Sequence, residues 1–330
     1  MERIVEAIRN AQTILLTTHR QCDGDGLGAE LALYYALKKI GKNVRVINVD
    51  ETPRKYRFLN PDFHITYFSE VPDLKIEADL CLVFDTNDQR LLEPLFSSVL
   101  KPHCKQIAFI DHHPVLSNGP QPTKESLIDI SSASTGEMAY RIIKALGIPL
   151  DTDIAKALYT SITFDTQLYR YIRNSPTSHR IAAELLEHPI DATNIHRYLF
   201  GNQTVQKFAF LAKALGQIEY FCDGQLAVLR VKDADLFHYN LEIDESRDVI
   251  DMVMNIESLE AAALFREDSP GEFKVSLRSK GQIEVHGVAE LLGGGGHVHA
   301  AGASVKGANY ADLKGQVVAE ISRRLSVSGT

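Results

Sequence analysis

Short apolar, β-rich runs alternate with helical segments over the first 111 residues, and this alternation restricts the fold more than any other feature. The runs occupy residues 13–18, 44–50, 78–85 and 106–111. An apolar-periodic helix is expected at 27–40, and Gly41 stands just beyond it, in the place of a C-cap glycine. A second helix is expected at 89–99. Strands and helices that alternate at this spacing predict a doubly wound parallel sheet.

Helices dominate the middle of the chain, and the pattern changes near Gly216. Ser134 and Glu137 have the capping-box spacing of a helix start. Further helices are expected at residues 153–164, 175–187, 191–198 and 204–215. Beyond Gly216, two β-rich runs around an Asp-Gly turn predict a hairpin. The remaining expected elements are strands at 261–268 and 272–279 and helices at 285–292 and 310–325.

Length and composition predict an ordinary soluble globular protein of two domains. A chain of 330 residues with 45% hydrophobic and 24% charged content can bury a sizeable core. We predict an α/β protein in three parts. These are an N-terminal domain with a doubly wound parallel sheet over 1–190, a helical linker over 191–215, and a smaller C-terminal domain of mixed α/β type over 216–330.

Charge and cysteine usage restrict the partners and the compartment. The net charge is −8, and from residue 216 onward 11 Lys+Arg stand against 18 Asp+Glu. Proteins that track long nucleic acid usually carry a basic stripe, so a nucleotide substrate is expected to be short and held by a few cations. No apolar run reaches the about 20 residues of a membrane helix, and the N-terminus has no signal-peptide pattern. Four scattered cysteines favour a reducing cytoplasm.

The loop after the first β-rich run supports two interpretations. Residues 24–29 have the G-x-G-x-x-A spacing of a dinucleotide site, and Asp50 lies about 20 residues further on, where a ribose-binding acid would stand. The same loop carries His19, Asp23 and Asp25 in the spacing H-x-x-x-D-x-D. Two carboxylates within the turn would repel a pyrophosphate, whereas they would attract a divalent cation. The metal interpretation is therefore favoured.

Acidic and histidine residues also follow the later strands. Asp85 ends one run, and Asp111, His112 and His113 follow in order at the end of the next. A later helix brings Asp165. Each of these residues alone is more readily explained as a turn residue, a helix cap or a satisfied polar group than as a metal ligand. Because the carboxyl ends of parallel strands open onto one crevice, their joint arrival there predicts a metal centre.

This ordered set of motifs resembles the DHH phosphoesterase superfamily. H-x-x-x-D-x-D is followed by D-T-x-D, by D-H-H and by a further Asp, and G-G-G-G-H-V-H-A-A-G is similar to the mark of the associated C-terminal domain. Together the motifs span residues 17–302. With two compact domains and no appended domain expected, the chain looks like the nano-RNase and pAp phosphatase branch. The longer exonucleases and the membrane-bound relatives carry further segments, and the glycine motif argues against an inorganic pyrophosphatase.

The resemblance implies two divalent cations. The implied ligands are His19 and Asp23 for the first ion, Asp25, His112 and Asp165 for the second, and Asp85 as the bridge between them. Mixed imidazole and carboxylate ligands favour manganese, with magnesium or cobalt as alternatives. Two such ions stabilise both the attacking and the leaving oxygen of an in-line displacement.

The resemblance also implies catalytic and substrate-binding residues. Asp85 and His113 are the expected catalytic residues, with His113 donating to a phosphate oxygen. The expected substrate contacts are Arg170, Arg278 as a bidentate phosphate clamp, Gly294, Gly295, Gly296 and His297. Relatives usually place glycine where Gln167 stands, so the backbone next to Asp165 is expected to differ there.

The activity implied is that of a manganese-dependent phosphoesterase. It would hydrolyse short oligoribonucleotides to 5′-mononucleotides and dephosphorylate pAp. The alternative within the same class is a phosphodiesterase for linear dinucleotides such as pApA. Neither a membrane nor a long nucleic acid is expected as a partner, and a homodimer is left open.

Overall fold

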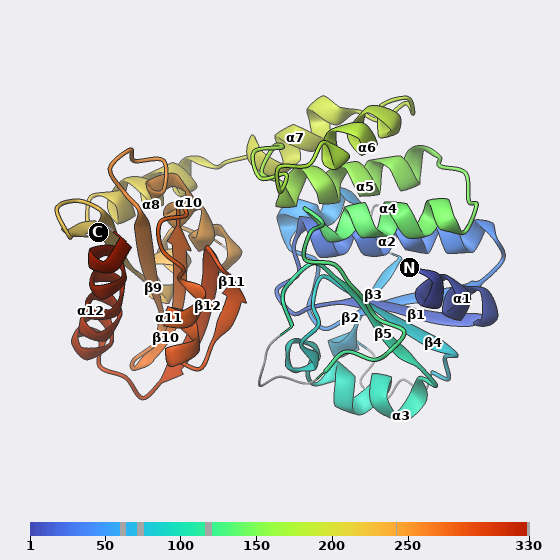
Figure 1. The fold of residues 1–330 in the computed structure, drawn as a ribbon, viewed down its shortest axis with the longest axis horizontal. Helices are drawn as coiled ribbons and strands as arrows, with labels where there is room; N and C mark the ends of the chain where they lie inside the picture. Colours follow the sequence, from blue (N-terminus) through green and yellow to red (C-terminus); the bar gives the residue numbers. More distant parts are fainter. Residues whose placement is uncertain (60–63, 71–75, 116–120, 242, 329–330) are drawn as a thin grey trace. The chain divides into compact units, whose positions relative to one another are not determined.

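The chain forms two compact units, Met1–Asn202 and Gln203–Thr330 (Figure 1). The computed structural model describes residues 1–59, 64–70, 76–115, 121–241 and 243–328. The helical span 191–215 contributes one helix to each unit. Helix α7 (Ala192–Phe200) buries its apolar side chains in the first unit, and α8 (Val205–Leu215) buries its own in the second.

The first unit is built on a sheet of six parallel strands in the order β3-β2-β1-β4-β5-β6. The strands are β1 (Thr13–Thr18), β2 (Asn43–Asn48), β3 (Ile65–Tyr67), β4 (Leu80–Phe84), β5 (Ile107–Asp111) and β6 (Leu127–Ile128). This confirms the predicted doubly wound parallel sheet. The edge strands β3 and β6 were not predicted, because two or three residues are too few to show a β period. The strand order reverses between β1 and β4, the point where open α/β sheets bind ligands.

Apolar side chains alternate between the two faces of this sheet. Ile14 and Leu16 of β1 belong to the cluster that contains the buried residues of the helices on one face, and Leu15 packs on the opposite face with Leu100. Figure 1 shows α2, α4 and α5 on the first face and α3 on the other. The helices of this unit are α1 (Glu2–Asn10), α2 (Gly24–Lys39), α3 (Lys101–His103), α4 (Thr135–Ala145), α5 (Thr152–Asp165), α6 (Thr177–Leu185) and α7.

Side-chain caps determine where the helices of the site begin. Helix α2 starts at Gly24, three residues before the predicted start, because the Asp23 carboxylate accepts the Asp25 N–H (3.1 Å) as an N-cap. Helix α4 starts as predicted after Ser134, whose hydroxyl accepts the Glu137 N–H (3.2 Å). The Glu137 carboxylate accepts from Ala133 N (3.1 Å) instead of from the capping serine. Both caps satisfy amides that a helix start leaves open.

The helix predicted at 89–99 is wrong. The structure instead has a 3₁₀ turn η3 (Gln89–Leu92), a π turn η4 (Phe96–Leu100) and the short α3. Pro94 lies between the two turns and has no N–H to donate, so a continuous helix cannot pass through it.

The second unit is built on a mixed sheet in the order β11-β12-β10-β9-β8-β7. Its elements are β7 (Glu219–Phe221), β8 (Leu226–Lys232), α9 (Asp233–His238), η5 (Ile243–Ser246), α10 (Arg247–Val253), β9 (Ala261–Ser269), β10 (Glu272–Ser279), α11 (His286–Leu291), β11 (Gly295–His297), β12 (Ala300–Lys306) and α12 (Tyr310–Ser328). Strands β8 and β9 are parallel and the other neighbours are antiparallel. The predicted hairpin is present as β7 and β8, and the mixed character of this unit is confirmed.

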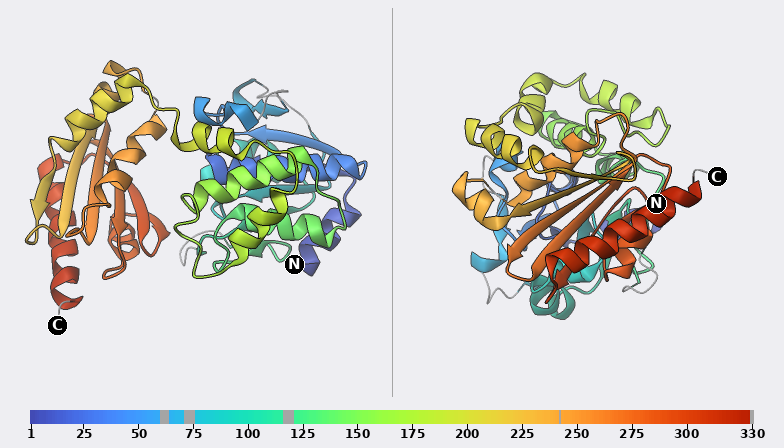
Figure 2. Two further views of the ribbon diagram at one scale, coloured as in Figure 1. Left: turned by 90° about the horizontal axis from the view of Figure 1, so that it is seen from above. Right: turned by 90° about the vertical axis from the view of Figure 1, so that its left-hand side faces the viewer.

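Helices cover both faces of the second sheet. Buried residues of α11 and α12 join one core, and those of α8, α9 and α10 join the other. Figure 2 shows α12 lying along one face of this sheet. Over the described residues, none of the helices combines the length and the apolar composition that crossing a bilayer requires.

Candidate metal centre

The predicted ligands lie at the carboxyl ends of three adjacent strands. His19 follows the last residue of β1, and Asp85 follows the last residue of β4. Asp111 ends β5, and His112 comes next. Asp165 is the last residue of α5 and approaches the same place from the helical side. The topology therefore gathers side chains that are up to about 150 positions apart in the sequence, at the point where the strand order reverses.

A first group consists of His19, Asp23 and Asp85. One potential ligand atom from each lies within 4.8 Å of the others. His19 Nε2 is 3.5 Å from Asp85 Oδ2, and its Nδ1–H donates to Arg20 O (2.7 Å). The carbonyl thus fixes the tautomer, so that Nε2 is the nitrogen facing the carboxylates.

A second group consists of Asp25, Asp85 and His112, with Asp165 beside it. His112 Nε2 lies 3.6 Å from one carboxylate oxygen of each of the three aspartates. These separations exceed hydrogen-bond length. Ligand atoms about 2.0–2.2 Å from a shared ion lie about 3–3.6 Å from one another, so the distances from His112 Nε2 fit a shared cation. Asp165 lies outside the group of ligand atoms that are all within 4.8 Å of one another, and it contacts the group through His112.

Asp85 is common to both groups and has an unusual backbone. Its φ is +60°, in the left-handed region that L-residues other than Asn and Asp rarely adopt. Its Oδ1 accepts the hydroxyl hydrogen of Thr135 (3.1 Å). Strained backbone of this kind persists only where the surroundings hold it, and it often marks a functional site. Asp85 therefore stands where a carboxylate could bridge two ions.

Helix α4 holds the carboxylate of Asp25. The amides of Thr135 and Gly136 donate to it at 2.7 and 3.1 Å, and the Ser161 hydroxyl donates to the same oxygen as Gly136. Thr135 and Gly136 are the first two residues of α4, where the helix leaves its N–H groups unpaired and its dipole favours a negative charge. The fully buried Asp25 is thereby fixed in one orientation.

Loops on either side hold the segment that carries His19 and Asp23. Arg20 N donates to Leu91 O (2.9 Å). Gln21 N donates to the Asp50 carboxylate (2.6 Å). Asp50, which the dinucleotide interpretation placed on a ribose, therefore holds the loop of the first ligand group.

The electrostatics of the cluster fit a cation. Burial, together with the charges of Asp85 and Asp165, raises the pKa of Asp25 well above its usual range. Burial would lower the pKa of His19, but this effect is outweighed by the hydrogen bond and charge of Asp85 and by the charge of Asp23. The pKa of His19 is therefore raised to about 9. Burial also raises the pKa of Asp165, a change that the charge of His112 opposes. Like charges gathered at low dielectric are unfavourable without a counterion, and a divalent cation reverses the sign of the interaction.

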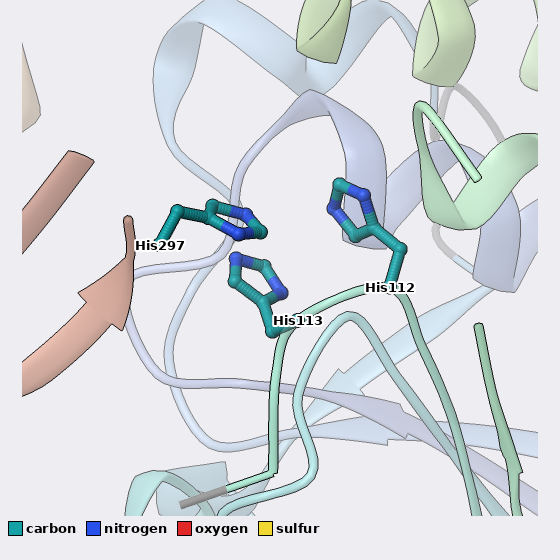
Figure 3. Close-up of side chains that lie close together, drawn as sticks. All are labelled: His112, His113 and His297. Atoms are coloured by element: carbon teal, nitrogen blue, oxygen red, sulfur yellow. The ribbon is translucent and has the colours of Figure 1, made fainter. Parts of the chain in front are cut away.

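His113 is held in a different way from His112. Its Nδ1–H donates to Asp111 Oδ1 (2.8 Å), and its Nδ1 is 3.7 Å from Asp85 Oδ1. Figure 3 shows the neighbouring rings of His112 and His113, whose centroids are 4.7 Å apart. Asn87 donates both to Asp111 Oδ2 (2.6 Å) and to His113 O (3.1 Å). Asp111 therefore orients His113, and Asn87 holds both residues in place.

The segment after Asp165 has a strained backbone. Gln167, Leu168 and Tyr169 have φ values of +46°, +62° and +64°. Gln167, where the resemblance implied glycine, thus occupies a conformation that favours glycine. Arg170 is exposed, with its guanidinium 5.8 Å from the centre of the Tyr171 ring.

Arg173 is a cation of this segment that sequence analysis did not single out. Its charge acts to lower the pKa of Asp165, which places it within electrostatic reach of the cluster. No spacing distinguishes it from the exposed arginines nearby, so the sequence held no signal for it.

The candidate residues of the second unit lie on one edge of its sheet. Ala300 of β12 pairs with His297 of β11 on one side and with Arg278 of β10 on the other. Directly opposed residues share a face, so His297 and Arg278 lie in one row, about 10 Å apart by strand spacing. Asp251 of α10 accepts a hydrogen bond from Arg278 Nε (3.1 Å) and so orients the guanidinium.

Packing accounts for part of the glycine run in this unit. Gly293 ends α11 with φ +77°. A Cβ on Gly294 would lie 2.0 Å from Gly302 O, and one on Gly296 would lie 2.7 Å from Ala300 O. These residues therefore let β11 lie close against β12, a requirement that exists with or without a substrate.

Several residues that shape the centre were missed by sequence analysis. They are Asn87, Thr135, Gly136, Ser161 and Arg173. Thr135 and Gly136 belong to the serine-rich segment that was interpreted only as a helix start, and that interpretation is correct as far as it goes. One signal was available. The free amides of a helix N-terminus bind anions, and the acidic loop elsewhere in the chain could have supplied the carboxylate that they bind.

The fold and the donor set together place the chain among the metal-dependent phosphoester hydrolases. Residues 13–162 match the family model described as the DHH family, N-terminal domain, and residues 223–326 match the DHHA1 domain. The chain therefore belongs to the DHH family, as its motifs implied.

Known proteins resemble the chain over its whole length. The bifunctional oligoribonuclease and PAP phosphatase NrnA of Thermus thermophilus is 28% identical over 333 residues, which cover 100% of this chain and 95% of the relative. The protein of the same name from Bacillus subtilis is 26% identical and covers 94% of each chain. The crystal structure of an exopolyphosphatase-related protein from Bacteroides fragilis superimposes with a TM-score of 0.86, at 22% identity and 98% coverage of both chains. That structure supports the fold.

Proposed function

We propose that this chain is a manganese-dependent phosphoesterase of the cytoplasm that hydrolyses very short oligoribonucleotides to 5′-mononucleotides and dephosphorylates pAp. The observation that carries the proposal is the position of Asp85, which belongs to both ligand groups at the switch point of the sheet. The full-length relatives named as bifunctional oligoribonuclease and PAP phosphatase support the choice of substrates.

Each of the two ligand groups would hold one ion. His19 and Asp23 would hold one ion, and Asp25, His112 and Asp165 would hold the other, with Asp85 between them. When bound, two divalent ions polarise the phosphoryl group and lower the pKa of a water nucleophile. The mixture of imidazole and carboxylate donors suits manganese better than magnesium, which prefers oxygen ligands and retained water.

His113 would act on the phosphate. Its Nδ1–H donates to Asp111, so we assign the contact with a phosphate oxygen to Nε2. Burial would lower the pKa of His113, but the charge and hydrogen bond of Asp111 outweigh it and raise the pKa. In its imidazolium form His113 would donate a charge-assisted hydrogen bond to a phosphate oxygen.

The remaining cations and glycines would bind the rest of the substrate. Arg170 would do so from the first unit, and Arg278, His297 and the segment 294–296 from the second. A chain of net charge −8 that relies on a few placed cations is suited to a substrate of few phosphates.

The proposal is tested by hydrolysis of RNAs of two to five nucleotides, and of pAp, by the purified chain with Mn²⁺. We expect 5′-mononucleotides by chromatography, and a loss of about a thousandfold or more in kcat/KM for Asp85→Asn, which keeps the shape but removes the shared charge. Glu51→Gln is the matched control, because it removes an exposed carboxylate of the same unit. An inactive wild type, or an Asp85→Asn variant with full activity, would contradict the proposal.

Substrate preference is measured by competition. Equal concentrations of pAp, pApA and a longer RNA are mixed with limiting enzyme, and each product is followed separately. We expect pAp and the shortest RNAs to be consumed first. A strong preference for pApA would instead identify the chain as a phosphodiesterase for linear dinucleotides.

A further inference from the structure

A row of buried polar groups adjoins the metal centre and supplies none of its ligands. It begins at Glu30 on α2, passes through Asn48 at the end of β2, and reaches Thr18 at the end of β1. Asn48 Nδ2 donates to Glu30 Oε2 (3.0 Å), and the backbone N–H of Thr18 donates to Asn48 Oδ1 (3.1 Å). The Thr18 hydroxyl donates in turn to Phe84 O (3.0 Å), at the end of β4.

This row is unfavourable for folding on its own account. Glu30 and Thr18 are 0% exposed and Asn48 is 1% exposed. Buried polar groups destabilise a protein unless they are hydrogen-bonded, and a carboxyl group is among the most costly to bury. Over the described part of the chain, Glu30 Oε1 has no hydrogen-bond partner. One accepted hydrogen bond does not offset the free-energy cost of burying the Glu30 carboxyl group. The presence of this group is better explained by a role in positioning Asn48.

The row ends where the ligand segments begin. Thr18 directly precedes His19, and Phe84 directly precedes Asp85, so the same hydrogen bonds fix the last residues of both strands. The Thr18 side chain has little room to change: a Cβ on Gly26, in the first turn of α2, would lie 2.2 Å from its hydroxyl oxygen. His19 Nε2 and Asp85 Oδ2 are the potential metal-ligand atoms, and the distance of 3.5 Å between them therefore depends on where Thr18 is held.

We propose that Asn48 and Glu30 are positioning residues of the metal centre, which hold the ends of β1 and β4 so that His19 and Asp85 stand at ligand distance. Asn48 is the central member, because its amide group donates to the helix side and accepts from the strand side. The inference rests on the proposed function only in that it takes His19, Asp23 and Asp85 as ligands of one ion. It concerns side chains that would touch neither metal nor substrate.

The test is Mn²⁺ binding to the full chain by calorimetry, with electron paramagnetic resonance to detect coupling between bound ions. We expect Asn48→Ala to weaken Mn²⁺ binding about 10- to 100-fold, the usual effect of losing a residue that orients a metal ligand, and to abolish the coupled-ion signal. Asn43→Ala is the matched control, since Asn43 is an exposed asparagine at the other end of β2. Glu30→Gln should bind Mn²⁺ like the wild type, because its amide oxygen accepts from Asn48 as the carboxylate does. Glu30→Leu should bind it weakly.

The outcomes separate the two proposals. A wild type that binds no Mn²⁺ would overturn the metal proposal and this inference together. A wild type that binds Mn²⁺, with a folded Asn48→Ala variant that binds within twofold of it, would overturn the positioning role alone. If Asn48→Ala does not fold, the two Glu30 variants provide the test. Equal Mn²⁺ binding by Glu30→Gln and Glu30→Leu contradicts the inference. Weak Mn²⁺ binding by Glu30→Leu, with binding by Glu30→Gln like that of the wild type, supports it.

Discussion

Asp85 combines a left-handed backbone with a shared charge, and aspartate is the residue type that supplies both. Its left-handed φ of +60° is tolerated by Asn and Asp among residues with a side chain, and its membership of both ligand groups requires a charged carboxylate. Asn would satisfy the backbone without the charge, and Glu would supply the charge at the wrong reach. This is why the Asp85→Asn variant isolates charge from conformation in the activity test above.

The raised pKa of His19 makes metal binding depend on pH. With a pKa of about 9 in the metal-free protein, the ring is mostly protonated at neutral pH. An imidazole must lose that proton before it can bind metal, so protons compete with the ion. We expect the affinity for Mn²⁺ to rise from pH 6 to pH 9, by about tenfold per pH unit where one proton is released per ion.

Calorimetry measures this linkage directly. Titrations at pH 7 in two buffers of different ionisation enthalpy give the number of protons released on binding, and we expect at least one. An affinity that does not change with pH would show that no proton leaves His19 on binding, which contradicts either its raised pKa or its place among the ligands.

Gln167 is a residue whose side chain conflicts with its backbone. At φ +46° a Cβ atom is strained and glycine is not. We expect Gln167→Gly to stabilise the protein by about 0.5–1 kcal/mol, after allowing for the greater freedom of glycine in the unfolded chain. Urea unfolding measures the change. Gln167→Ala retains the Cβ and should not raise the free energy of unfolding. An equal rise in both variants would show that the stability gain comes from removing the Gln167 side chain and not from relief of backbone strain.

At the scale of elements, glycine lets three helices and a strand end approach one another. A Cβ on Gly24 would lie 2.7 Å from the Phe164 ring, and one on Gly28 would lie 2.5 Å from Ala157 O of α5. A Cβ on Gly136 of α4 would lie 2.1 Å from the hydroxyl of Ser161. Gly24 and Gly26, the two glycines that suggested a dinucleotide site, are thus explained by close packing against Phe164 and Thr18. Gly28 and Gly136 let α4 and α5 approach the Asp25 carboxylate.

Gly28→Ala tests this packing. The added methyl group would meet a backbone carbonyl of α5 that cannot move alone, so α2 and α5 must separate. We expect a loss of about 1–3 kcal/mol in the free energy of unfolding, together with weaker Mn²⁺ binding. The control is Gly315→Ala in α12, where a Cβ meets nothing within 4 Å and where alanine should stabilise by about 0.5–1 kcal/mol. A neutral Gly28→Ala would contradict the account of how α2 and α5 fit together.

At the scale of the molecule, each unit has its own cores. The first unit buries one cluster on each face of the parallel sheet, and the second does the same on its mixed sheet. All of the implied metal ligands lie within Met1–Asn202, whereas Arg278 and His297 lie in the second unit. Metal binding and substrate binding are therefore separable in principle.

A fragment of residues 1–202 should fold cooperatively and bind Mn²⁺ within several-fold of the affinity of the full chain. It should lose at least about tenfold in kcat/KM on short RNA, because the cations and glycines of the second unit are missing. Circular dichroism, calorimetry and the hydrolysis assay measure the three properties. A fragment that hydrolyses short RNA at the full rate would show that the second unit does not contribute to substrate binding.

Sequence reasoning found the parts of this molecule that have a local signature. The strands β1, β4 and β5 were predicted because apolar runs of five or six residues are bounded by polar loops, and the capped start of α4 because its motif is contiguous. The strands β3 and β6 and the broken segment around Pro94 were missed or predicted wrongly. They are two to five residues long and take their shape from what packs against them.

The residue types of the candidate site, their order along the chain and the sheet that gathers them were determined by the sequence alone, because local periodicity and fixed spacings encode them. The resemblance already implied Asp85 as the shared carboxylate, and the tertiary structure decided which neighbours hold it and the other candidate ligands in place. Thr135 and Asp25, joined by a hydrogen bond across 110 positions, have no relation that a pattern could reveal. Such contacts arise only when strands far apart in sequence become neighbours, which is a property of the folded chain and not of any segment of it.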